Sequence, residues 1–369
     1  MPYQQDSPSP SMHWNVMGSA VSSRGATLVF ILFTYLLIVR ALRYRRMKKL
    51  EHSFGYGTRK PLGEMTLDDA AAILLELSEM EFPFSFLNST QFALFRTYGI
   101  PTVSSLLVST NQITSPETVS KRLVDTGVLM FEIWGRAPTS TRWLESVARM
   151  NYIHGMYQKA GKISNDDMLH SLSFFAGEPF KWISRYEWRN LSDMEVAALG
   201  TSGRVWARRC RLTSAVYQAT EKAGKMEVTG LKRLWLGPKK KPSPVFFTFT
   251  ETALAFRRLF LRHLALPRPE MWRSRYLEDE ANEFGRFNLK MYGGLPIYVK
   301  PTFAWRWNIQ AWLFWALGKP IPGDGGNKYI PQGYNIHEVG PRSMAGKGLN
   351  AAADLREKML QRGRCPFRA

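Results

Sequence analysis

Residues 141–159 read TRWLESVARMNYIHGMYQK, and the spacing of the apolar residues in this stretch decides the fold class. Trp143, Val147, Met150, His154 and Tyr157 follow one another at intervals of four, three, four and three positions. Residues at these intervals share one face of an α-helix. The stretch is therefore predicted to be a helix that packs against the core, with His154 on its apolar face.

Helical patterns also dominate on both sides of this stretch. Thr66, Ser115 and either Ser164 or Asn165 precede runs that open with acidic residues or proline, as helix starts do. Strand patterns are few, and VFFTFT at residues 245–250 is the best of them. The predicted fold class is mainly α.

A histidine on an apolar face has two interpretations. The commoner one is a core histidine whose hydrogen bonds are satisfied within the protein. The other is an axial ligand to haem, because haem iron binds a neutral imidazole held in an apolar slot by a neighbouring acceptor. His154 is a candidate for either role.

A second stripe runs along the helix predicted after Ser115 and consists of Val119, Arg122, Thr126, Leu129 and Ile133. Arg122 and Thr126 are one turn apart. An arginine on an otherwise apolar face needs an anion or several carbonyl groups as partners. A structural salt bridge satisfies that need, and so does a haem propionate or a site that polarises bound oxygen.

Asp166, Asp167 and His170 form a third candidate set, because they lie within about one helical turn and could bind a non-haem metal. Acidic residues at such positions more commonly cap a helix start. The two cysteines, Cys210 and Cys365, cannot form a disulfide framework, and neither has the glycine-rich context of a P450 thiolate ligand.

An uncharged run at residues 25–39, GATLVFILFTYLLIV, predicts a membrane anchor. Arg24 and Arg40 bound this run and can extend the span to residues 20–42. The basic sequence RALRYRRMKK follows the run, which is the reverse of a signal peptide and places the bulk of the chain in the cytosol. The sequons at Asn88 and Asn190 should then carry no glycan.

The formal net charge of +20 is concentrated in two segments. Residues 40–60 hold eight basic residues and one acidic residue, and residues 201–241 hold eleven and two. The first segment adjoins the anchor, so membrane orientation explains it. No zinc-finger, helix-turn-helix or RNA-binding signature is present, and no nucleic-acid partner is expected.

Longer motifs give a family resemblance. They are RMNxIH (149–154), GKISNDD (161–167), EPxxWI (178–183), EWR (187–189), LALPRP (264–269), YVKPT (298–302), PxGYNIHEVGP (331–341) and CPF (365–367). Together they resemble the family of the fungal ER-bound oxygenase MpaB and the bacterial rubber oxygenases, or latex-clearing proteins. The resemblance extends over most of residues 115–367.

The resemblance implies a helical domain that binds haem b and uses dioxygen to cleave olefins. The family pattern has an Arg and a Thr four positions apart, followed about thirty residues later by the haem-binding His. Arg122, Thr126 and His154 match it, while Asp125 replaces the Lys that neighbours the Thr in rubber oxygenases. The implied substrate is lipophilic, with a prenyl or terpenoid side chain from fungal specialised metabolism, and the implied location is the endoplasmic reticulum membrane.

The expected organisation is a lumenal tail (1–19), a transmembrane anchor (20–42), a basic juxtamembrane linker (43–65), a catalytic helical domain (66–345) and a C-terminal tail (346–369). Within the catalytic domain, residues 201–245 are atypical for the family because they are strongly basic. That departure keeps open an alternative function, a catalytically impaired or non-catalytic membrane scaffold.

Overall fold

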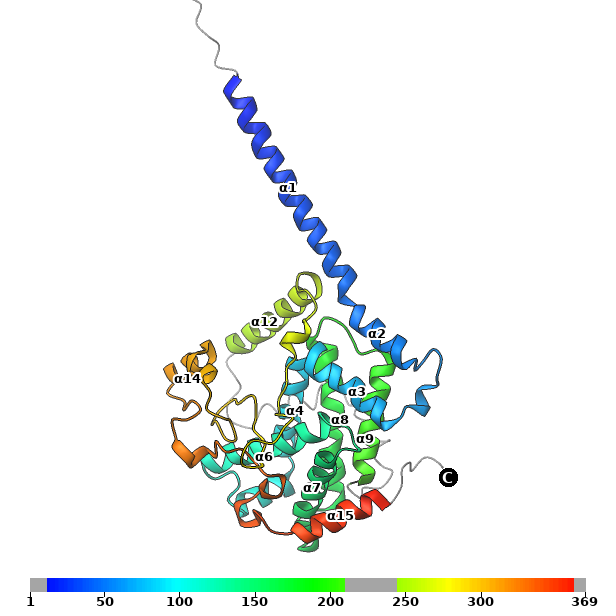
Figure 1. Ribbon diagram of the computed structural model, residues 1–369, viewed down its shortest axis with the longest axis vertical. Coiled ribbons are helices and arrows are strands. Elements are labelled where there is room, and N and C mark those ends of the chain that lie inside the picture. Colours follow the sequence, from blue (N-terminus) through cyan, green and yellow to red (C-terminus); the bar gives the residue numbers. More distant parts are fainter. Residues whose placement is uncertain (1–11, 210–243, 362–369) are drawn as a thin grey trace, which may run out of the picture.

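The computed structural model describes residues 12–209 and 244–361, and in these ranges the chain is mainly helical, as predicted (Figure 1). The longer helices are α1 (Met12–Arg43), α2 (Arg45–Phe54), α3 (Leu67–Glu76), α4 (Pro83–Thr97), α5 (Pro101–Ser109), α6 (Pro116–Trp134), α7 (Thr141–Lys159), α8 (Asn165–Tyr186), α9 (Asp193–Arg209), α12 (Pro244–His263), α14 (Ile309–Ala316) and α15 (Leu349–Gln361). Short helices include α13 (Phe303–Trp307), the π-helical turn η2 (Leu77–Glu81), and the 3₁₀ turns η1 (Leu62–Glu64), η3 (Glu270–Trp272), η4 (Gly326–Tyr329), η5 (Ile336–Glu338) and η6 (Arg342–Met344). Within the described ranges, β-pairing is limited to isolated bridges such as that between Phe287 and Tyr334.

Helix α1 projects away from the rest of the chain, which we call the body (Figure 1). The stretch Arg24–Phe54 is long and apolar enough to cross a membrane, and almost none of its most apolar part is buried against the body. The helix already begins at Met12, inside the segment expected as a tail. Residues 43–65, expected as a linker, contain α2 and the buried Tyr56, whose hydroxyl donates to Asp69.

The body is a bundle in which α4 packs along α8, α3 along α9, and α6 and α15 against α7. The predicted helix starts are confirmed at Thr66, Ser115 and Ser164. Each side chain accepts a hydrogen bond from the backbone N–H three residues later. These caps satisfy N–H groups that have no partner inside the helix.

The strand predicted at residues 245–250 is wrong, because these residues form the first turns of α12. Alternating Phe and Thr favours a strand only when one face of the segment packs on a sheet. Among the described residues no neighbouring strand is available, and the segment is helical.

Residues 264–348 wrap around the bundle with little regular structure, and buried polar contacts attach them to it. Glu132 on α6 is fully buried, pairs with Arg142 on α7, and accepts a hydrogen bond of 2.6 Å from the Tyr334 hydroxyl. Tyr334 belongs to the PxGYNIHEVGP motif, so one part of the family pattern serves to dock this wrap on the helices.

Candidate functional site

The candidate site is a cavity of about 170 Å³ enclosed by helices α4 to α9 and closed by Gly340 and Pro341 of the wrap. Its walls are mostly apolar. They include Leu94, Leu107, Leu129, Met130, Met150, Ile153, Tyr157, Met168, Leu172, Phe175 and Trp206. Three predicted residues, Arg122, Thr126 and His154, also line it. The two sequence stripes therefore meet at one cavity, as the family resemblance implied.

The His154 ring presents a neutral imidazole to this cavity. The ring is half-buried, because part of it is accessible from the cavity that it lines. Burial, with a smaller effect from the nearby Arg122 guanidinium, lowers its pKa from 6.5 to about 4. Its Nδ1 atom is buried and has no hydrogen-bond partner in the described part of the chain. A neutral imidazole has one unprotonated ring nitrogen, which can bind a metal ion.

Arg122 and Thr126 form a polar spot on the wall of the cavity that α6 contributes. The Arg122 guanidinium donates to the Thr126 hydroxyl, and that hydroxyl donates back to the Arg122 carbonyl at 2.8 Å. Within residues 12–209 and 244–361, no carboxylate lies within ion-pair distance of Arg122. The structure thus does not provide the salt bridge that would have made Arg122 purely structural, and its charge is available to an anion in the cavity.

Asp125, which replaces a Lys of the rubber oxygenases, is buried beside this spot. It pairs with Lys121 and accepts hydrogen bonds from the Tyr298 hydroxyl at 2.9 Å and the Gly340 N–H at 3.1 Å. Burial raises the pKa of Asp125, and the Lys121 ammonium opposes that change. The carboxylate fixes the wrap to α6, which sequence analysis did not foresee, although Lys121 and Asp125 have the spacing of a helical ion pair.

Arg149 holds the cavity closed from the other side. Its side chain is completely buried and donates to the carbonyls of Val339 at 2.9 Å, Met344 at 2.8 Å and Lys347 at 2.8 Å. Gly340 has a φ of +116°, and a Cβ there would lie 2.6 Å from the Ile153 side chain. The close approach of wrap and helix therefore requires glycine at this position.

Asp166, Asp167 and His170 are not gathered into a metal site. In the described ranges, no group of three or more His, Cys, Asp or Glu residues is placed to hold a metal ion. Asp167 instead completes the cap of α8 with Ser164 and accepts a hydrogen bond of 2.7 Å from the Thr102 hydroxyl. Asp166 and His170 are exposed, and the His170 ring contacts the edge of Phe174.

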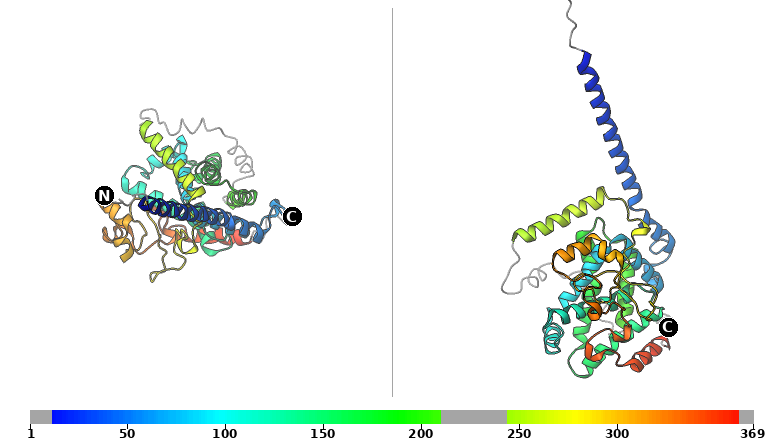
Figure 2. Two further views of the ribbon diagram at one scale, coloured as in Figure 1. Left: turned by 90° about the horizontal axis from the view of Figure 1, so that it is seen from above. Right: turned by 60° about the vertical axis from the view of Figure 1, so that its left-hand side comes forward.

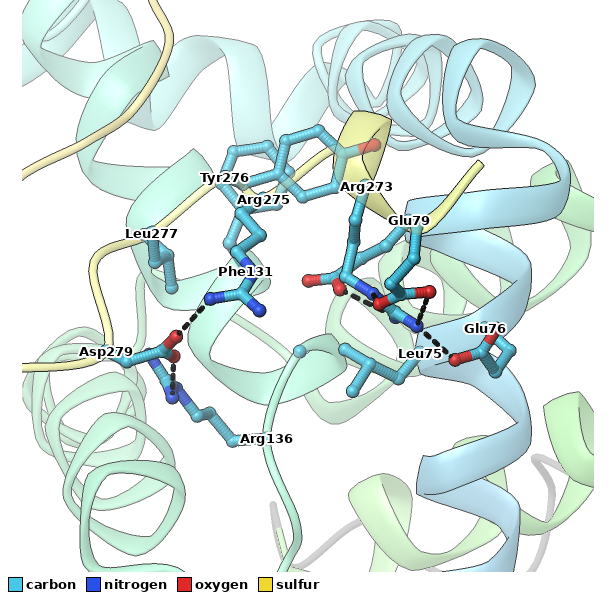
Figure 3. Close-up of a pocket in the computed structure, with 12 residues that line it drawn as sticks. Leu75, Glu76, Glu79, Phe131, Arg136, Arg273, Arg275, Tyr276, Leu277 and Asp279 are labelled. Atoms are coloured by element: carbon cyan, nitrogen blue, oxygen red, sulfur yellow. Dashed lines mark hydrogen bonds and ion pairs between the residues drawn. The ribbon is translucent and has the colours of Figure 1, made fainter. Parts of the chain in front are cut away.

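A second cavity of about 370 Å³ is lined mainly by charged residues of α3, η2 and residues 270–279 (Figure 3). Its charges are paired with one another: Arg273 with Glu76, Glu79 and Glu270, and Asp279 with Arg136 and Arg275. The Phe131 and Tyr276 rings stack at 4.6 Å beside them. This cavity has no histidine in its lining and no unpaired charge of the kind found at Arg122, so the smaller cavity remains the candidate site.

Comparison with known proteins agrees with the motifs. The chain is 35% identical to the ER-bound oxygenase mpaB' of Penicillium brevicompactum, over 92% of this chain and 94% of the relative. It is 37% identical to the ER-bound oxygenase mpaB of the same fungus, over 83% of this chain and 85% of the relative. The chain belongs to the MpaB family of ER-bound oxygenases. A third member, mpaB of Penicillium roqueforti, is 47% identical over 47% of this chain and 58% of the relative.

No family model and no solved structure matches the chain. Membership of the MpaB family confirms an oxygenase, and hence an oxidoreductase, with one apolar helix suited to membrane attachment. The alignment with mpaB' is 399 positions long, which exceeds the 369 residues of this chain. The relative therefore contains residues that have no counterpart here. The atypical segment 201–245 lies mostly outside the described residues.

Proposed function

We propose that this member of the MpaB family uses haem b, bound through His154, to cleave a C=C bond in a lipophilic substrate with dioxygen. One observation carries the proposal. A neutral imidazole, an arginine without an acidic partner and a hydroxyl face one apolar cavity. The substrate class we infer is a prenyl or terpenoid side chain from fungal specialised metabolism.

The chemistry of the cavity lining fits haem b. His154 offers a neutral ring nitrogen, Arg122 offers a cation for a propionate or for negative charge on an oxygen, and the remaining walls exclude water. The volume of about 170 Å³ is below the roughly 300 Å³ at which ligand pockets begin. Binding a macrocycle therefore requires the walls to move apart, and the wrap segment at Gly340 and Pro341 is the wall that lies outside the helical bundle.

When bound, haem supplies the redox centre at which dioxygen reacts with an olefin. In the balanced reaction, the two oxygen atoms end in two carbonyl groups, one on each carbon of the former double bond. The protein's own contribution is to keep His154 neutral, to aim the Arg122 cation through Thr126, and to hold the hydrocarbon chain on Leu129, Met150 and neighbouring apolar side chains.

The proposed topology is a single membrane span with the body in the cytosol. It is supported by the basic residues that follow the apolar run of α1, since such residues remain on the cytosolic side. A prenylated substrate partitions into the same bilayer, so the anchor brings enzyme and substrate together. Asn190 is exposed and would be glycosylated if the body were lumenal. A glycan at this residue would therefore contradict the cytosolic placement of the body.

Replacing Arg122 with Gln is expected to lower turnover about 100-fold, which is the size of effect seen when one preorganised donor is removed from an oxyanion hole. The guanidinium is the cation that stabilises negative charge next to His154, whereas Gln keeps only a hydrogen bond to Thr126. Dioxygen uptake and carbonyl products are measured with the purified full chain in liposomes, using a farnesylated phenol as the probe.

Arg342 provides the matched control, because it is an exposed arginine in the wrap, and Arg342→Gln should leave turnover unchanged. Full turnover by Arg122→Gln would refute the role of Arg122. A wild-type chain that consumes no dioxygen with any prenylated probe and contains no haem would support the membrane-scaffold alternative instead.

A further inference from the structure

Helix α12 is amphipathic, and its apolar face points away from the body. Val245, Phe249, Phe256, Leu259 and Phe260 lie at helical spacing along one face, and all of them are exposed. Phe249 and Phe256 are each 70% exposed. A helix that packs on a soluble body normally buries such a face, and among residues 12–209 and 244–361 this face has no covering partner.

The inner face of α12 carries Leu261, which packs against the hydrophobic core, together with charged side chains that fix this orientation. Glu251 pairs with Arg185 at the end of α8, and Arg257 pairs with the buried Glu187. The Arg257 guanidinium also lies 4.3 Å from the centre of the Phe84 ring. These contacts hold the charged side of α12 against the body and leave its aromatic side facing outward.

A second exposed apolar segment spans residues 303–317, which include α13 and α14. Phe303, Trp307, Ile309, Trp312 and Trp315 are each more than half exposed. Helices α12 and α14 both lie at the end of the body from which α1 rises (Figures 1 and 2). Tryptophan is the residue that collects at membrane–water interfaces. We call the outer face of α12 together with residues 303–317 the aromatic surface.

Hydrogen bonds fix the end of α12 at a defined level along α1. The Tyr35 hydroxyl donates to the Leu264 carbonyl at 2.6 Å, and Arg43 donates to the Ala265 carbonyl. Tyr35 is five residues before Arg40, or about 7.5 Å along a helix. Leu264 follows α12 directly, so the end of α12 lies level with the apolar part of α1. That level corresponds to the roughly 5–10 Å depth of interfacial helices.

We propose that the aromatic surface is a second membrane-binding site, which lies in the leaflet from which the body emerges, in the same bilayer that α1 crosses. The depth match to α1 and the exposed tryptophans favour a bilayer over a second copy of the chain. Arg262 and His263, exposed at the end of α12, are placed to reach lipid headgroups. The body is thereby attached to the membrane at two places rather than suspended from one helix.

The test uses the full chain with Cys210 and Cys365 replaced by Ser, and with one new cysteine that carries an environment-sensitive fluorophore. Phe256→Cys and Trp312→Cys report on the aromatic surface, and Leu32→Cys in α1 verifies insertion. Lys159→Cys, at the exposed end of α7, is the control. Each protein is placed in phosphatidylcholine liposomes with or without a nitroxide on the acyl chains.

At positions 256 and 312 the emission should shift to the blue, and the nitroxide lipid should remove about half of it or more, as for a group within the acyl boundary. Position 159 should show neither effect. The proposal is overturned if position 256 behaves like position 159 while position 32 is quenched. It is equally overturned if the shift at 256 is not quenched by lipid and vanishes at one chain per vesicle, since a second copy would then cover this surface.

Discussion

Replacing Arg149 with Leu is expected to lower the free energy of unfolding by at least about 3 kcal/mol. The side chain is fully buried and donates to the carbonyls of Val339, Met344 and Lys347. Removing it leaves three acceptors without a partner, at about 1–3 kcal/mol each. A buried charge pair can often be exchanged for apolar residues at no cost. Here the partners are backbone carbonyls, which no second substitution can remove.

The same substitution is expected to reduce turnover, because the carbonyls that Arg149 binds flank Gly340 and Pro341, which close the cavity. Denaturant unfolding of the detergent-solubilised chain gives the stability change. The stability of Arg149→Lys should lie between those of wild type and Arg149→Leu, because an ammonium group cannot form the planar set of hydrogen bonds that a guanidinium forms. The exposed Arg342→Leu should change stability by no more than about 0.5 kcal/mol. If Arg149→Leu lowered the free energy of unfolding as little as Arg342→Leu, Arg149 would not be what holds the wrap on the helices.

The second large effect is a dependence of stability on pH that originates at His154. Its pKa is 6.5 in the unfolded chain and about 4 in the folded chain. At neutral pH the ring is uncharged in both states, so its protonation does not contribute to the free energy of unfolding. In the haem-free chain, as the pH falls from 6.5 toward 4, only the unfolded state takes up the proton, so the folded state loses about 3 kcal/mol relative to it.

His154→Leu removes this contribution, so the free energy of unfolding of the variant should fall less between pH 6.5 and pH 4. At pH 8 the difference in unfolding free energy between the variant and wild type reports only the change in packing. The exposed His170 supplies the matched control, His170→Leu, in which an imidazole outside the cavity is removed. Unfolding free energies measured at several values between pH 4 and pH 8 separate these cases. Parallel pH curves for wild type and His154→Leu would show that the ring is not held neutral by burial.

The helical fold and the placement of Arg122, Thr126 and His154 on apolar helix faces were predictable because both depend on local spacing. Residues three or four positions apart share a helix face whatever the rest of the chain does. Spacing alone does not say which faces meet, and it was the family resemblance that linked Arg122 and Thr126 to His154. The capping residues Thr66, Ser115 and Ser164 were predictable for the same reason, since a cap acts within three residues.

The partners that lie far away along the chain were not predictable in this way. Asp125 and Gly340 are 215 positions apart, and Arg149 binds carbonyls about 190 positions further along. The family motifs marked these residues without revealing which of them touch. Residues 245–250 show the opposite failure, since a short local pattern favoured a strand where the surroundings impose a helix with an outward apolar face.

The assignment of His154 as the haem ligand is tested most directly by the optical spectrum of the purified full chain in detergent. We predict a Soret band and one iron per chain for wild type and for His170→Ala, and the loss of both in His154→Ala. A Soret band that is unchanged in His154→Ala would contradict the assignment, because the iron would then be held elsewhere.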